Sequence, residues 1–187
     1  MSTESIEKSR STSWLEDYFS KQAGNPINLS DSHSQVITNF TLLWNLFESR
    51  FLQVDKIWTE ANRGPIPKQF DKPINKAYRF IKQRYKDYLG LTDANKEEQF
   101  YRILGFIRLE NGIEKKDSYR KKVYQFLSTP SSLEEKKYAC LMVIYRYRNN
   151  LFHGNKDLAR IWNERDLVLF EVVCDFLIAY LDAYPVV

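Results

Sequence analysis

The chain has 187 residues, 43% of them hydrophobic, with only six glycines and six prolines, so we expect one folded domain around a sizeable core. Its net charge of +4 is mildly basic, which suits a polyanionic partner without requiring one. The first residues lack the apolar core of a signal peptide and no run reaches membrane-spanning length, which excludes a membrane span and predicts a cytoplasmic protein without a membrane partner.

The chain is expected to begin with a polar arm over residues 1–29, followed by a helical domain over residues 30–187. Residues 1–13 are rich in Ser and Thr, which is typical of disorder. A short amphipathic spacing then predicts a helical turn that docks on the domain; its residues are Trp14, Leu15, Tyr18 and Phe19. The stretch "AGNPINLSDS" (23–32) interrupts the chain before the domain.

The first long helix is predicted to begin at Ser32, where Ser32 and Gln35 fit a capping box. Its apolar residues recur with the helical period; they are Val36, Phe40, Leu43, Trp44, Phe47 and Phe51. Glu48 is a charged residue inside this apolar stripe. His33, beside Asp31, is interpreted as a surface histidine.

Five further helices are predicted after a loop over residues 62–73. The first of them carries the apolar residues Ile74, Tyr78, Ile81, Tyr85 and Leu89 and is expected to end at Gly90. The second carries Phe100, Ile103, Leu104 and Ile107 and is expected to end near Asn111–Gly112. The third is short, carries Val123, Phe126 and Leu127, and is expected to end at Pro130. The next helix begins with a Ser132–Glu135 capping box and is expected to end at Gly154. A last helix runs from about Asp166 to Tyr184, which makes five with those before it. No stretch alternates with period two for long, so the predicted fold class is all-α: an up-and-down bundle of about four core helices plus short extra helices.

Basic and aromatic residues are interleaved between Glu114 and Arg148, a mixture that suits RNA phosphates and unstacked bases. The candidate RNA-binding residues are Lys115, Lys116, Lys121, Lys122, Arg146, Tyr145 and Tyr147. A solvated helix face is an equally good interpretation of the same pattern. The two cysteines, Cys140 and Cys174, lie in apolar contexts without metal-ligand spacing, and we expect free thiols.

Arg148 lies in the middle of the apolar stripe of its helix, whose members are Leu141, Ile144, Tyr145, Leu151 and Phe152. A guanidinium cannot lose its charge, so a half-buried one needs an anionic partner or an acidic ligand, and we expect it to meet Glu48. His153 follows five residues later, about 140° around a continuous helix. For both to reach one substrate, the helix must end near Phe152 or two copies must face each other across a two-fold axis.

The string "RNNLFHG" (148–154) resembles the R-x4-H signature of the HEPN superfamily, the higher eukaryotes and prokaryotes nucleotide-binding domains. The helix "TLLWNLFESRFL", which contains Glu48, is similar to the first core helix of Apea-like HEPN domains. The resemblance spans residues 32–184 and implies an all-α homodimer with a composite active site at its interface. It also implies a metal-independent endoribonuclease that serves as a toxin or an effector of antiviral defence.

By this resemblance, Arg148 and His153 are the catalytic pair, Asn149 orients them, and Glu48 is an acidic helper. Members paired with a nucleotidyltransferase antitoxin often carry a tyrosine where this chain has Asn155, so control through that tyrosine is not expected. Because no sensor or antitoxin domain is visible in the sequence, we expect an antitoxin or sensor partner to control the activity.

The chemistry is coherent from the residues alone. RNA carries its own nucleophile, the 2′-hydroxyl, so cleavage needs a proton acceptor, a proton donor and stabilisation of a charged phosphorane. A histidine with a pKa near ~6.5 can exchange protons at neutral pH, and a guanidinium can donate two hydrogen bonds to phosphate oxygens. We therefore expect His153 to act as general acid or base and Arg148 to hold the phosphate, with no cofactor and no metal site.

Other interpretations stay open. The Glu48–Arg148 pair can be a structural ion pair, and His153 can be a helix-end residue beside exposed carbonyls. The rival functions are a non-catalytic dimerising or nucleotide-binding HEPN module in a regulatory assembly, and a basic scaffold whose RNA affinity comes only from residues 115–148.

Overall fold

The computed structural model describes residues 20, 26, 31–52, 57–90, 93–129, 131–152 and 164–184; side chains are not described at 31–34, 58, 152 and 164–167. The expected arm over residues 1–29, with its docking turn, falls almost wholly outside the described residues. The same holds for His153 and for the expected helix end at Gly154. The predictions about these segments stay predictions.

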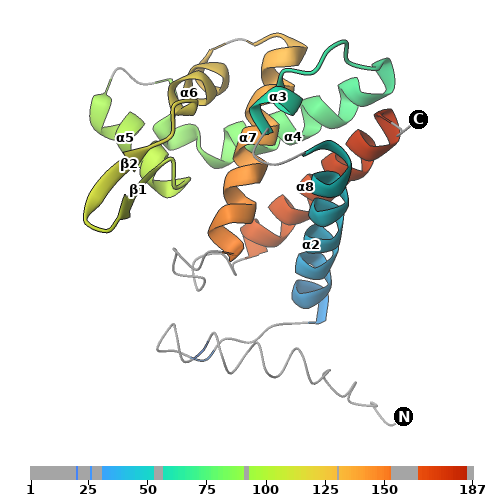
Figure 1. Ribbon diagram of the computed structural model, residues 1–187, viewed down its shortest axis with the longest axis horizontal. Helices are drawn as coiled ribbons and strands as arrows, with labels where there is room; N and C mark the ends of the chain where they lie inside the picture. The colour runs from blue at the N-terminus through green and yellow to red at the C-terminus, as the bar shows by residue number, and fades with distance from the viewer. Residues whose placement is uncertain are drawn as a thin grey trace.

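The described chain is mostly helical, as the sequence predicts (Figure 1). The helices are α2 (Asp31–Phe51), α3 (Ile57–Ala61), α4 (Asp71–Arg84), α5 (Ala94–Ile103), α6 (Arg120–Ser128), α7 (Leu133–Phe152) and α8 (Glu164–Ala183). Two short 3-10 turns, η1 (Lys68–Phe70) and η2 (Lys86–Tyr88), precede and follow α4. None of the described helices combines the length and the apolar character needed to span a membrane.

Helical periodicity and capping explain the two helices that matter most for the site. On α2 the residues Phe40, Trp44 and Phe47 are fully buried, at the spacing that places them on one face. α7 begins with the predicted capping box: the backbone N–H of Ser132 donates to Glu135 Oε2 at 2.8 Å, and that of Glu135 donates to Ser132 Oγ at 3.3 Å. Both predictions are confirmed.

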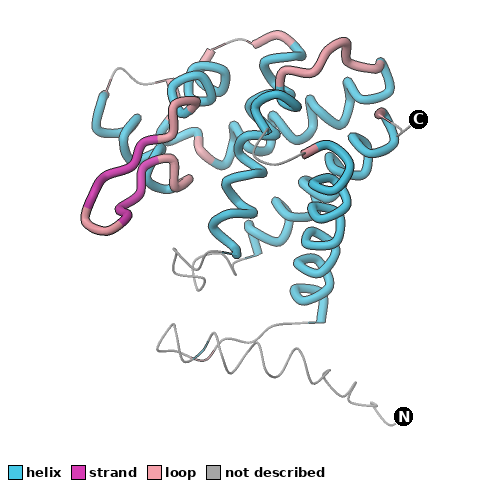
Figure 2. The backbone as a smooth tube through the Cα atoms, in the orientation of Figure 1, coloured by secondary structure: helices cyan, strands magenta, loops and turns pink. Residues whose placement is uncertain are grey.

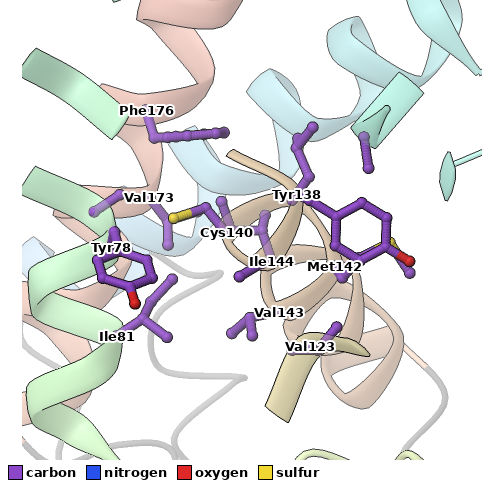
Figure 3. Close-up of a cluster of buried hydrophobic side chains, with 14 of the residues drawn as sticks. Tyr78, Ile81, Val123, Tyr138, Cys140, Met142, Val143, Ile144, Val173 and Phe176 are labelled. Carbon is purple, nitrogen blue, oxygen red and sulfur yellow. The ribbon is translucent and has the colours of Figure 1, made fainter. Parts of the chain in front are cut away.

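α7 is the central helix and packs against α3, α4 and α6, while α8 packs against α2 and α4 (Figure 1). Figure 3 shows the apolar core between them, where side chains of several helices converge around α7; the labelled ones include Tyr78, Ile81, Val123, Cys140, Met142, Val143, Ile144, Val173 and Phe176. Each large apolar side chain buried there contributes about 1.5–3 kcal/mol to folding. Cys140 is buried and Cys174 half-buried, and both are free thiols as expected.

The prediction that the third helix continues through Ile107 is wrong. α5 ends at Ile103, Gly105 adopts a left-handed conformation with φ +71°, and the chain then forms an antiparallel hairpin of β1 (Ile107–Glu110) and β2 (Ile113–Lys116). Ile107 lies opposite Lys116 and Glu110 opposite Ile113. Figure 2 shows this hairpin, in magenta, extending away from the helices.

The physical reason for the hairpin lies in two turns. A glycine in the left-handed region ends a helix without the steric penalty that a Cβ would bring. At the tip, Asn111 and Gly112 have φ values of 52° and 77°, the positive values that a two-residue type I′ hairpin turn requires. Two further differences are smaller. The sequence does not predict α3, and α4 ends at Arg84, before the predicted stop at Gly90.

Candidate functional site

Glu48 and Arg148 meet, as the sequence predicts. Arg148 Nη2 donates to Glu48 Oε2 at 3.2 Å, joining α2 to α7 across 100 residues of sequence. Arg148 Nη1 also lies 3.3 Å from Oδ1 of Asn149, which accepts a hydrogen bond from it. The side chains of Arg148 and Glu48 are 24% and 37% exposed, so solvent reaches this cluster from one side. The structure thus brings three of the four predicted catalytic residues together.

An aromatic contact lies one helical turn away from this ion pair. The Trp44 ring, fully buried, lies 6.2 Å from the ring of Tyr145. Trp44 precedes Glu48 by four residues and Tyr145 precedes Arg148 by three, so α2 and α7 touch at two successive turns. An exposed ion pair contributes only about 0–1 kcal/mol, whereas burial of a Trp contributes more. The aromatic contact is therefore the larger stabilising contribution of the two, and the ion pair orients the guanidinium beside it.

His153 lies outside the described residues. α7 is described as far as Phe152, the residue that directly precedes His153 in the sequence. The expectation that the helix ends near Phe152 falls on residues outside the described ranges and stays a prediction. That His153 reaches the substrate held by Arg148 stays a prediction.

The assignment of Arg146 to an RNA-binding surface is wrong, because its guanidinium is buried. Only 6% of the residue is exposed. It donates from Nε to the carbonyl of Leu104 at 3.2 Å and from Nη2 to the carbonyl of Gly105, and its Nη1 lies 3.3 Å from Asp117 Oδ2. Arg146 thus attaches α7 to the segment between α5 and the hairpin.

Tyr145 and Tyr147 are half-buried and pack against the core. The ring of Tyr145 packs against Trp44. The Tyr147 hydroxyl lies 2.6 Å from that of Tyr85, and its ring lies 6.4 Å from the ring of Phe170. Both rings therefore serve in packing, which leaves less of their faces for a stacked base.

The four candidate lysines are exposed on β2 and α6. Lys116 pairs with Glu114 at 2.8 Å. The Nζ of Lys122 lies 4.2 Å from the centre of the Tyr138 ring and donates to Asn62 Oδ1 at 3.3 Å. Figure 1 shows the hairpin and α6 on one side of α7 and α2 on the other. The structure therefore does not bring the lysines together with the Glu48–Arg148 pair.

Sequence reasoning missed Asp117, Asn150 and Gly105, which surround Arg146. A signal for them exists in α7, where Ala139, Val143, Arg146 and Asn150 recur at helical spacing and are all buried. Two polar residues on a buried face require polar partners from another segment. Within the described ranges, no group of three or more His, Cys, Asp or Glu side chains is placed to hold a metal ion.

Comparison with protein-family models, curated proteins and solved structures finds no match for this chain. Its function therefore has to be argued from the Glu48–Arg148–Asn149 cluster and the residues around it.

Proposed function

We propose that this chain is a metal-independent endoribonuclease of the HEPN type, acting in the cytoplasm as a toxin or an effector of antiviral defence. The observation that carries the proposal is the contact between Arg148 Nη2 and Glu48 Oε2 at the solvent-reachable end of α7. This end of the helix leads directly into His153. A phosphate-binding cation and a histidine that titrates near neutral pH are the two groups that cleavage by a 2′-hydroxyl requires.

In the proposed reaction, the 2′-oxygen of RNA forms a bond to the adjacent phosphorus while the bond from phosphorus to the 5′-oxygen breaks. A base removes the proton of the 2′-hydroxyl, and an acid gives a proton to the leaving 5′-oxygen; His153 supplies general acid–base catalysis. Arg148 donates to the non-bridging phosphate oxygens, whose charge grows in the transition state. The products are a 2′,3′-cyclic phosphate and a 5′-hydroxyl.

Glu48 and Asn149 have supporting roles in this proposal. A guanidinium has five N–H donors, so a carboxylate on one edge can orient it while another edge faces a phosphate. Glu48 supplies that carboxylate from α2, and Asn149 accepts from Nη1 on the same helix. The orientation of Arg148 is thereby set before RNA binds, which lowers the cost of ordering it during the reaction.

We further propose that two copies form a homodimer whose active site is composed of residues from both chains, and that an antitoxin or sensor partner silences it. In a two-fold dimer, the same surface of each subunit forms the interface. If the ends of two α7 helices meet in this way, each phosphate is exposed to Arg148 and His153 from both chains.

The direct test incubates the purified full-length chain with total RNA in EDTA. We expect cleavage by the wild type and none by His153→Ala, because that variant lacks the group that exchanges protons. His33→Ala is the matched control, since His33 is the chain's other histidine and lies at the start of α2. Circular dichroism verifies that the variants are folded. Cleavage by His153→Ala at the wild-type rate would contradict the proposal.

One observation favours the alternative of a non-catalytic dimerising or nucleotide-binding module. Two of the four candidate lysines have partners within the chain, and β2 and α6, which carry all four, lie on the other side of α7 from α2, which carries Glu48 (Figure 1). This alternative predicts that the wild type leaves RNA intact and that nucleotide binding tolerates His153→Ala.

A further inference from the structure

A buried polar cluster holds the C-terminal part of α7 on the side opposite Arg148. Arg146 and Asn150 are four residues apart, so they share one face of the helix. Arg148 lies two residues from each, about 200° around the axis from Arg146. Both Arg146 and Asn150 are buried, whereas Arg148 is reached by solvent. One face of the same two turns is therefore anchored, and the other presents the guanidinium to Glu48.

The anchor consists of side-chain donors on α7 and backbone carbonyls just after α5. The carbonyl of Leu104 accepts from Arg146 Nε at 3.2 Å and from Asn150 Nδ2 at 3.3 Å, and the carbonyl of Gly105 accepts from Arg146 Nη2. Carbonyls at a helix C-terminus lack partners within the helix, and these two obtain theirs from α7.

Asp117 completes the cluster from the far end of the hairpin. Its Oδ2 lies 3.3 Å from Arg146 Nη1, and its Oδ1 lies 2.7 Å from Nη1 of Arg108 on β1. Tyr119 donates to Oδ2 at 3.1 Å, and the backbone N–H of Asp117 donates to the carbonyl of Phe106 at 2.9 Å. One carboxylate thus joins the hairpin to α7 and balances the charge of the buried Arg146.

The cluster is closely packed at Gly105. A Cβ placed there would lie 2.7 Å from Asn150 Oδ1 and 2.8 Å from Arg146 Nη2, and the residue has φ +71°. Both observations require glycine at this position. A side chain at this position would therefore displace the side-chain ends of Arg146 and Asn150 that hold α7 to the turn.

We infer that Asp117 and Asn150 are positioning residues, which act through α7 to aim Arg148 at the substrate phosphate. This inference rests on the proposed function. A helix anchored only by apolar contacts can rotate or slide between nearby packings, whereas hydrogen bonds to two fixed carbonyls define one rotation. A displacement of about 1 Å from the productive geometry can reduce a rate about a hundredfold.

The test compares Asp117→Asn with Glu114→Gln in the full-length chain. Both changes remove a carboxylate charge from the hairpin region, but the partners of Glu114 are Arg102 on α5 and Lys116 on β2, whereas Asp117 pairs with Arg146 on α7. The first readout is the NMR signal of the Arg148 Nε–H group, assigned by its loss in Arg148→Lys. The second readout is RNA cleavage, with kcat and KM measured separately.

We expect Asp117→Asn to shift the Arg148 signal and to lower kcat at least about tenfold, with KM within about twofold, and Glu114→Gln to change neither. Asn150→Ala, which removes no charge, should also shift the Arg148 signal and lower kcat. If Asp117→Asn does not fold, this variant replaces it in the test, and an unchanged Arg148 signal in it would overturn the inference. An unchanged Arg148 signal in folded Asp117→Asn would overturn the inference. If the wild type cleaves no RNA, the proposed function fails, and the NMR readout still decides whether Asp117 positions Arg148.

Discussion

Arg148 and Lys137, both on α7, differ in how far their charged side chains are buried. Arg148 is half-buried and paired with Glu48, whereas Lys137 of α7 is only 1% exposed. Lys137 Nζ donates to the carbonyl of Arg63, whose own Nε lies 3.0 Å from the buried Glu60 Oε1. Burial lowers the pKa of Lys137 to about 8, against the opposing effect of Glu60, which raises it. A lysine in this state destabilises the fold when it is charged.

This buried lysine predicts a stability that rises with pH. In the unfolded chain Lys137 titrates near its ordinary value of about 10.4, so between about pH 8 and 10 the unfolded state binds more protons than the folded one. We therefore compare the free energy of unfolding of the wild type with that of Lys137→Met. Between about pH 7.5 and 9, the difference between the two should change by about 1 kcal/mol in favour of the wild type. Urea titrations of both proteins measure it, and a constant difference across this range would contradict the prediction.

At the scale of the element, the helix boundaries follow from local chemistry. α7 begins where Ser132 and Glu135 satisfy each other's backbone N–H groups, which the sequence predicts from the two residues alone. The hairpin could not be predicted in the same way. Ile103, Leu104 and Ile107 fit a helical spacing, and only the left-handed conformation of Gly105 shows that the helix stops before Ile107.

The capping box predicts a measurable loss when its hydroxyl is removed. Ser132→Ala deprives the backbone N–H of Glu135 of its acceptor and should lower the free energy of unfolding by about 1 kcal/mol. Ser49→Ala is the matched control, because that exposed hydroxyl donates to the carbonyl of Leu46 within α2. The control should stay within about 0.5 kcal/mol of the wild type in urea unfolding. Equal losses in the two variants would show that the cap contributes nothing specific.

At the scale of the whole molecule, α7 connects two regions that are distant in the sequence. On one face Arg146 and Asn150 hold the turn before the hairpin, and on another Tyr145 and Arg148 contact α2. A rotation or tilt of this helix therefore offers a direct route by which a change at the hairpin can reach the candidate site. The positioning experiment on Asp117 examines that connection.

The sequence predicts the meeting of Glu48 and Arg148 because each is a charge in an apolar stripe and needs a partner. It predicts the wrong environment for Arg146, since burial of that guanidinium depends on Asp117 and on carbonyls that only the tertiary fold brings close. The sequence likewise does not predict that Trp44 pairs with Tyr145, although it places Trp44 in the apolar stripe of its helix. Periodicity identifies which residues face inward, and contacts between elements decide what they face.

The central claim is that the 2′-hydroxyl of RNA is the nucleophile and that the chain needs no metal. The most direct measurement is end-group analysis of a short RNA cut by the wild type in EDTA, beside the same RNA with a 2′-deoxy nucleotide at the cleaved position. We predict 2′,3′-cyclic phosphate and 5′-hydroxyl ends on the first RNA and no cut at the substituted nucleotide. Products with 5′-phosphate and 3′-hydroxyl ends, or cleavage of the 2′-deoxy position, would contradict the claim.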